Sequence, residues 1–123
     1  MHMRHPPSTP PSLAQLSQFD LHARLQDLTG VALITFTGPG CGSCRHLRRV
    51  LADVREQRPD WHLYEVDAQR ESGLTNEFEV FHLPSIFLFH NGAYHSRIEA
   101  EARTASIIET VTAALQQPAS EAP

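Results

Sequence analysis

The sequence predicts an α/β domain with a mixed β-sheet, and three features lead to this fold class. An apolar run over 31–36 has the length and the residue types of a buried strand. After a break rich in glycine and proline, Leu47, Val50, Leu51 and Val54 recur at helical spacing. Asn91-Gly92 then favours a two-residue hairpin between two further strands, so part of the sheet must be antiparallel.

The 123 residues are enough for one domain with its own core. Four of the nine prolines lie in the first eleven residues. We expect a disordered, proline-rich tail over 1–12, a folded domain over 13–117 and a flexible C-terminal tail over 118–123. No apolar run approaches about 18 residues, so we expect no membrane span.

The charges exclude several functional classes. The net charge is −4, and the ten cationic side chains are all arginine. A chain without a basic excess is not expected to bind nucleic acid, and a chain without lysine cannot form a lysine Schiff base. The N-terminus has no apolar stretch of the kind that a secretory signal needs, so we expect a cytoplasmic protein.

The only cysteines, Cys41 and Cys44, are separated by two residues. A disulfide that closes so short a loop adds little stability, so the pair indicates chemistry or metal binding. The histidines do not have the short spacing to these cysteines that a zinc site requires, and we expect no metal. No nucleotide-binding glycine pattern is present, and we expect no other cofactor.

The two cysteines lie in the first turn of the predicted helix 41–57, which Pro59 ends. Unpaired N–H groups and the helix dipole at this position favour a thiolate at Cys41. Cys44 continues the apolar stripe of the helix. We therefore expect Cys41 to be the exposed, attacking thiol and Cys44 to be the buried, resolving thiol.

Together with later segments, this motif resembles the thioredoxin family. The matching segments are Cys41-Gly42-Ser43-Cys44, the strand ending at Asp67, the stretch 74–85 that contains Pro84-Ser85, and the hairpin at 86–92. The resemblance spans about residues 17–116. It implies a thioredoxin fold, with helices on both faces of the central sheet and a short first strand. The expected order is helix 20–28, strand 31–37, helix 41–57, strand 61–67, helix 72–80, strands 85–90 and 93–98, and helix 104–116.

The resemblance also implies a substrate-binding loop at Leu83, Pro84 and Ser85. Pro84 is expected to be cis and to face Cys41. The backbone at Leu83 would then be free to pair with an extended substrate segment.

The sequence departs from the family pattern at several positions. Gly40 stands where the family has tryptophan, and Ser43 stands where it has proline. Thr35 and Leu63 stand in place of a buried acid and its lysine partner. Proton transfer to the buried cysteine would then need water, a hydroxyl such as Thr35 or Ser43, or another titratable group such as His82.

Six residues are candidate modulators of the cysteines: Thr35, Gly40, Gly42, Ser43, Arg45 and His82. His82 could carry a proton or stabilise the thiolate, or it could be an exposed loop residue. Arg45, Arg48 and Arg49 would favour a thiolate, or they could simply form a solvated helix face. Arg45 lies nearest the sulfurs in the sequence.

We expect a monomeric thiol–disulfide oxidoreductase that reduces or exchanges protein disulfides through a mixed disulfide. Its electrons would come from an external reductase or a dithiol donor. The alternative is a thioredoxin-like module that binds protein or senses redox state with little turnover. The residues between the cysteines influence the reduction potential, so the sequence leaves open whether the protein is a reductant or an oxidant.

Overall fold

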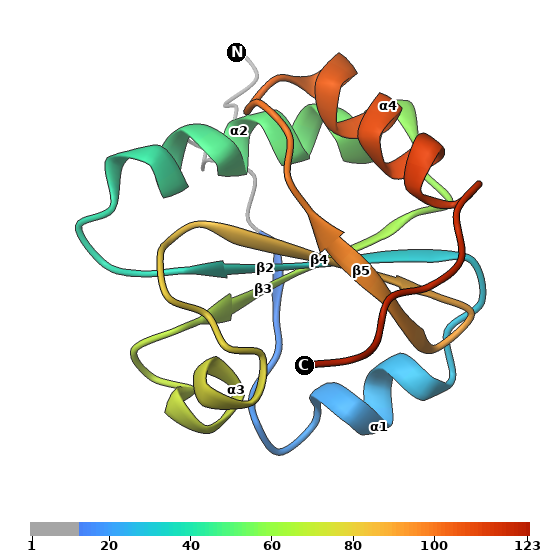
Figure 1. Cartoon of the computed structure of the whole chain (residues 1–123). Helices are drawn as coiled ribbons and strands as arrows, with labels where there is room; N and C mark the ends of the chain where they lie inside the picture. The colour runs from blue at the N-terminus through green and yellow to red at the C-terminus, as the bar shows by residue number, and fades with distance from the viewer. Residues whose placement is uncertain (1–12) are drawn as a thin grey trace, which may run out of the picture.

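The computed structural model describes residues 13–123 and consists of a five-stranded sheet with four helices (Figure 1). The expected tail 1–12 lies outside the described residues. The elements in chain order are β1 (Ala14–Gln15), α1 (Leu21–Gln26), β2 (Val31–Thr37), α2 (Gly42–Gln57), β3 (His62–Asp67), α3 (Ser72–Glu77), β4 (Ser85–His90), β5 (Ala93–Ile98) and α4 (Thr104–Ala114).

The sheet is mixed, as predicted, with the strand order β1-β3-β2-β4-β5. β1, β3 and β2 are parallel, whereas β4 is antiparallel to both β2 and β5. The hairpin between β4 and β5 turns at Asn91 and Gly92, whose φ angles are 52° and 83°. Positive φ at both positions is the requirement of a type I′ turn, which explains the Asn-Gly sequence. The central strand, β2, leads directly into the cysteine motif.

Helices cover both faces of the sheet, with α2 and α4 on one side and α1 and α3 on the other (Figure 1). Alternation along β2 separates two cores. Leu33 packs with Leu47, Leu51 and other residues under α2 and α4. Ile34 and Phe36 pack on the opposite side with residues of α1 and α3 and a group of aromatic rings. Packing against the sheet thus fixes the position of α2 relative to β2.

The predicted elements are all present, and most of their bounds agree to within one or two residues. The third helix is shorter than the expected 72–80 and ends at Glu77. The chain reverses there through Glu79, which has a φ of 53°, and Val80 N–H donates to Thr75 O. Within the described residues, no helix is both long enough and apolar enough to span a membrane.

The C-terminal segment 118–123 lies alongside β5 (Figure 1). Ser120 N–H donates to His95 O at 2.7 Å. The preceding Gln117 carbonyl lies 3.1 Å from Nε2 of the buried His95. The expectation that this segment is a flexible tail remains a prediction.

Candidate functional site

The two cysteines form a disulfide at the start of α2, with their Cα atoms 5.2 Å apart. A turn over Gly38-Pro39-Gly40-Cys41 brings the chain from β2 into this helix. Pro39 followed by Gly40 with a φ of +71° fits a type II turn, which needs positive φ at its third position. The turn therefore explains why glycine, and not the tryptophan of the family pattern, stands at position 40.

The two sulfurs differ in their surroundings, as expected. Cys44 is fully buried, whereas Cys41 is partly exposed. Cys41 is the N-cap residue of α2, and its Sγ accepts a hydrogen bond from Cys44 N–H at 3.2 Å. A sulfur at this position faces the positive end of the helix dipole, which favours the thiolate in the reduced state.

Three candidate modulators lie in the first turn of α2 with Cys41. Ser43 Oγ lies 3.5 Å from Cys41 Sγ. A Cβ atom built on Gly42 would lie 3.8 Å from Arg45 Nη2, so the guanidinium lies beside the backbone of the first helical turn. A hydroxyl beside this sulfur and a cation in the same helical turn both favour its anionic form.

The cis-proline loop lies next to the cysteine turn. The Leu83–Pro84 peptide bond is cis, as expected from the resemblance. A Cβ atom added to Gly38 would lie 2.8 Å from Leu83 Cδ1, so the Leu83 side chain packs closely against the backbone of the cysteine turn. Ser85 Oγ donates to His82 O at 2.8 Å and ties the loop to the start of β4.

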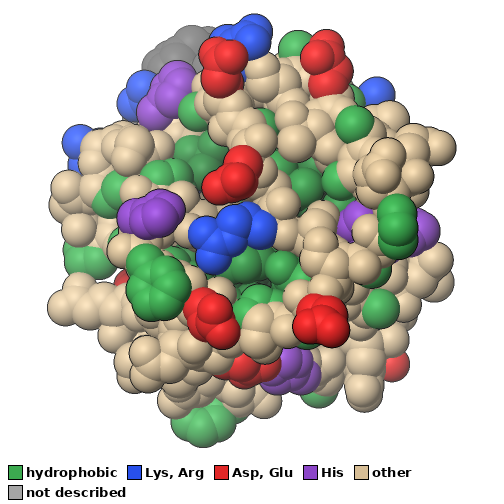
Figure 2. Space-filling model, in the orientation of Figure 1, with side chains coloured by type: hydrophobic (Ala, Val, Ile, Leu, Met, Phe, Trp, Pro, Cys, Tyr) green, Lys and Arg blue, Asp and Glu red, His purple; other side chains and the backbone are tan. Residues whose placement is uncertain are grey.

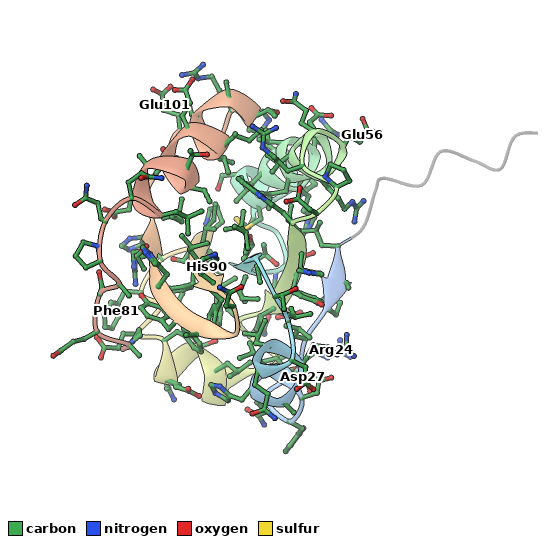
Figure 3. All side chains as sticks on the ribbon, turned by 90° about the vertical axis from the view of Figure 1, so that its right-hand side faces the viewer. Arg24, Asp27, Glu56, Phe81, His90 and Glu101 are labelled. Atoms are coloured by element: carbon green, nitrogen blue, oxygen red, sulfur yellow. A yellow bond between two sulfur atoms is a disulfide. The ribbon has the colours of Figure 1, made fainter. Side chains whose placement is uncertain are left out.

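A groove extends from Pro84 between α2 and the end of β5. Its lining includes Leu47, His82, Pro84, Arg97, Glu99 and Ala102. On the face seen in Figure 2, basic, acidic and histidine side chains alternate with hydrophobic surface, and the described residues there form no continuous basic patch. Phe81 is 82% exposed and lies at the surface (Figure 3). The groove and Phe81 thus present both apolar and polar contacts near the cis-proline loop.

Thr35 lies in β2 beneath α2 and is 1% exposed. Its neighbours in the sheet are Glu65 of β3 and Ile86 of β4. Its hydroxyl is the one buried side-chain nitrogen or oxygen without a hydrogen-bond partner among residues 13–123. The structure therefore places a polar group at the position of the missing acid but leaves it unpaired.

The structure contains a buried acid that the sequence analysis missed. Glu65 is 3% exposed, and its carboxylate accepts hydrogen bonds from Gln15 Nε2 at 3.2 Å, Thr37 Oγ1 at 2.5 Å and Arg48 Nε at 2.7 Å. Arg48 is consequently not part of a solvated helix face, because it pairs beneath α2 with β3. Leu63 and Glu65 lie two residues apart in β3, so both side chains face α2. This alternation is the sequence signal that places Glu65 beneath the helix.

The last predicted modulator, His82, and a second histidine, His46, both lie at the surface. His82 is exposed in the loop before Pro84 and lines the groove. His46 is also exposed, and its Nε2 lies 3.1 Å from the carbonyl oxygen of Ala102. Within the part of the chain that the structure describes, no three His, Cys, Asp or Glu side chains are grouped so that they could hold a metal ion.

Comparisons with known proteins agree with this geometry. The thioredoxin family model matches residues 12–113. Thioredoxin Y of Oryza sativa subsp. japonica, a chloroplastic protein, is 25% identical over 85 residues, which cover 68% of this chain and 51% of that protein. Thioredoxin of Mycoplasmoides gallisepticum is 25% identical over 60 residues, which cover 49% of this chain and 60% of that protein. The chain thus spans about half to three fifths of the length of these relatives.

Solved structures share the fold at lower identity. Thioredoxin from Trypanosoma brucei brucei superposes with a TM-score of 0.72 at 16% identity, over 93% of this chain and all of that one. Fasciola hepatica thioredoxin gives a TM-score of 0.72 at 18% identity, over 82% of this chain and 98% of that one.

Proposed function

Because this chain belongs to the thioredoxin family, we propose that it is a thiol–disulfide oxidoreductase that acts on protein disulfides through Cys41 and Cys44. The observation that carries the proposal is a disulfide at the first turn of α2, in a turn that contacts the cis-proline loop. One sulfur is accessible and the other is buried, which suits a two-step exchange.

In the reducing direction, the Cys41 thiolate attacks one sulfur of the substrate disulfide. A bond forms between Cys41 Sγ and that sulfur, and the other substrate sulfur leaves as a thiolate that takes up a proton. Cys44 then loses its proton and attacks Cys41 Sγ. The Cys41–Cys44 disulfide forms, and the second substrate sulfur is released as a thiolate, so two electrons have passed to the substrate.

The groups around Cys41 support its role as the attacking sulfur. The N-terminus of α2 and Cys44 N–H stabilise negative charge on it. Ser43 Oγ and the Arg45 guanidinium add a hydrogen-bond donor and a cation nearby. Together these favour the thiolate form of Cys41 in the reduced protein.

The substrate is an extended segment of a protein, bound at the cis-proline loop. The backbone of Leu83 offers hydrogen bonds to an extended chain beside Cys41. Phe81 and the groove beside Pro84 add side-chain contacts. The reoxidised cysteines are reduced by an external reductase or a dithiol donor. A monomeric, cytoplasmic protein remains our expectation.

The test is a trapping experiment with Cys44→Ser. Without the resolving thiol, the mixed disulfide between Cys41 and a protein substrate should accumulate, and non-reducing gels followed by mass spectrometry should detect it. Cys41→Ser is the matched control and should trap nothing. Trapping by Cys41→Ser alone would reverse the two roles, and trapping by neither variant would favour a binding or sensing module with little turnover.

A further inference from the structure

The unpaired hydroxyl of Thr35 requires a physical explanation. It is buried in the central strand, and it has no hydrogen-bond partner among residues 13–123 while the cysteines are oxidised. Burial of a hydroxyl without a partner destabilises a folded protein, so such a group calls for an explanation, and a redox or catalytic role is one. The neighbouring Thr37 shows the usual outcome, because its hydroxyl bonds to Glu65 and Arg48.

The fold directs Thr35 toward Cys44. Alternation along β2 puts Thr35 on the same face as Leu33 and Thr37. Leu33 packs in the core beneath α2, and Thr37 Oγ1 accepts a hydrogen bond from Arg48 Nη2 at 3.3 Å. Thr35, which lies between these two residues, therefore faces α2 as well.

Along α2, the fully buried Cys44 is the first residue of the inward stripe. β2 and α2 run in opposite directions, so the first turn of α2 lies above the end of β2 (Figure 1). Ile86, the partner of Thr35 in β4, lines the groove together with Leu47 and Pro84. Thr35 thus lies beneath the buried sulfur and close to the cis-proline loop.

We infer that the Thr35 hydroxyl donates a hydrogen bond to the Cys44 sulfur in the reduced protein and so stabilises the dithiol relative to the disulfide. The inference rests on the proposed function, since it concerns the same cysteine pair. A disulfide sulfur has no proton and is a weak acceptor. Reduction leaves Cys44 as a thiol that can exchange hydrogen bonds with the Thr35 hydroxyl, and its sulfur becomes a strong acceptor when it loses its proton to attack Cys41. The hydroxyl is therefore unpaired in the oxidised state and gains its partner when the Cys41–Cys44 bond breaks.

The direction of the expected change in reduction potential follows from this difference between the oxidised and reduced states. Thr35→Val removes the hydroxyl with little change of shape. It removes an unpaired group from the oxidised protein and a hydrogen bond from the reduced protein, and both changes favour the disulfide. The variant should therefore have a more negative reduction potential than the wild type.

The experiment is an equilibrium titration with glutathione, read by alkylation of the free thiols. Two glutathione thiols reduce the protein disulfide to two thiols and become one glutathione disulfide, so two electrons and two protons pass to the protein. We expect Thr35→Val to lower the equilibrium constant for reduction about tenfold, which is a shift of about −30 mV. Thr35→Ser keeps a hydroxyl and should remain close to the wild type.

Thr37→Val is the matched control. It removes a buried hydroxyl from the same face of β2, but one that is already paired in the oxidised protein. It should reduce the thermal stability of both redox states and leave the potential unchanged. In a Cys41→Ser background, Thr35→Val should also move the alkylation of Cys44 to higher pH.

An unchanged or more positive potential in Thr35→Val overturns the inference, and so does an equal shift in Thr35→Ser or Thr37→Val. The proposed function would survive each of these results. A wild-type pair that does not equilibrate with glutathione would overturn the proposed function and the inference together.

Discussion

At the scale of single residues, the site depends on backbone geometry as much as on the cysteines. Gly40 adopts a φ of +71° in the turn that presents Cys41, and Gly38 lets that turn contact Leu83. A side chain at Gly38 would push against the end of the Leu83 side chain. A tryptophan at position 40 would require a different turn, so the absence of the family's tryptophan is a consequence of how this loop is built.

Gly40→Ala tests this reading of the turn. Open space surrounds a Cβ atom at this position, so the cost comes from the positive φ alone. We expect a loss of about 1 kcal/mol in the free energy of unfolding, measured with urea on the oxidised protein. Gly42→Ala is the control, because Gly42 is helical and should tolerate or favour alanine. Equal stability of Gly40→Ala and the wild type would mean that the turn does not need glycine.

At the scale of elements, α2 is joined to β3 by charge as well as by apolar packing. Arg48 reaches beneath the helix to the carboxylate of Glu65, which is 4% exposed in its side chain, compared with 32% for Arg48. Glu65 also accepts hydrogen bonds from Gln15 and Thr37, so the network joins β1, β2, β3 and α2. This network fixes the second turn of α2, one turn after Cys44.

A double-mutant cycle with Arg48→Met and Glu65→Gln measures this connection. Loss of Arg48 leaves a buried carboxylate with fewer partners, and we expect a loss of about 3 kcal/mol in stability. The double variant should recover part of it, with a coupling energy of about 1–3 kcal/mol. The exposed pair Arg103–Glu101 is the control and should couple by less than about 1 kcal/mol. Equal coupling in both cycles would show that burial of Glu65 adds nothing.

The same elements show where sequence reasoning succeeds and where it does not. Periodicity and turn signals predict β2, α2 and the Asn91-Gly92 hairpin because each depends on local residues. The pairing of Arg48 with Glu65 depends on which side chains meet across two layers, and a helix position next to other arginines gave no sign of it. Likewise, the sequence places Thr35 opposite the missing acid, but only the packed structure shows its hydroxyl to be unpaired.

At the scale of the whole molecule, the redox site and the C-terminal segment lie on opposite sides of the fold. The sulfurs lie at the α2 side of the sheet, whereas Ala122 and Pro123 line a cavity with Phe78, Phe89 and Tyr94 on the α1 and α3 side. Burial raises the pKa of Tyr94, although the nearby Arg97 partly opposes this effect. The C-terminal segment therefore contributes to the environment of an ionisable group far from the cysteines.

The ionisation of Tyr94 tests whether 118–123 is a packed segment or a flexible tail. Folding favours the neutral phenol, so its contribution to stability is complete below the unfolded pKa and is lost as pH rises through the folded pKa. In a Tyr64→Phe background, ultraviolet absorbance should show Tyr94 ionising above the ordinary pH for tyrosine. Deletion of 118–123 should lower that pH and leave the reduction potential unchanged. An unaltered Tyr94 titration would support the flexible tail.

The most direct measurement is the reduction of insulin disulfides by dithiothreitol in the presence of this protein, followed by turbidity. The wild type should accelerate the reaction well above dithiothreitol alone, because the Cys41 thiolate exchanges faster than a free thiol. Cys41→Ser should abolish the acceleration while the fold remains intact by circular dichroism. A wild-type rate equal to that of Cys41→Ser would contradict the oxidoreductase function and leave a thioredoxin-like binding or sensing module.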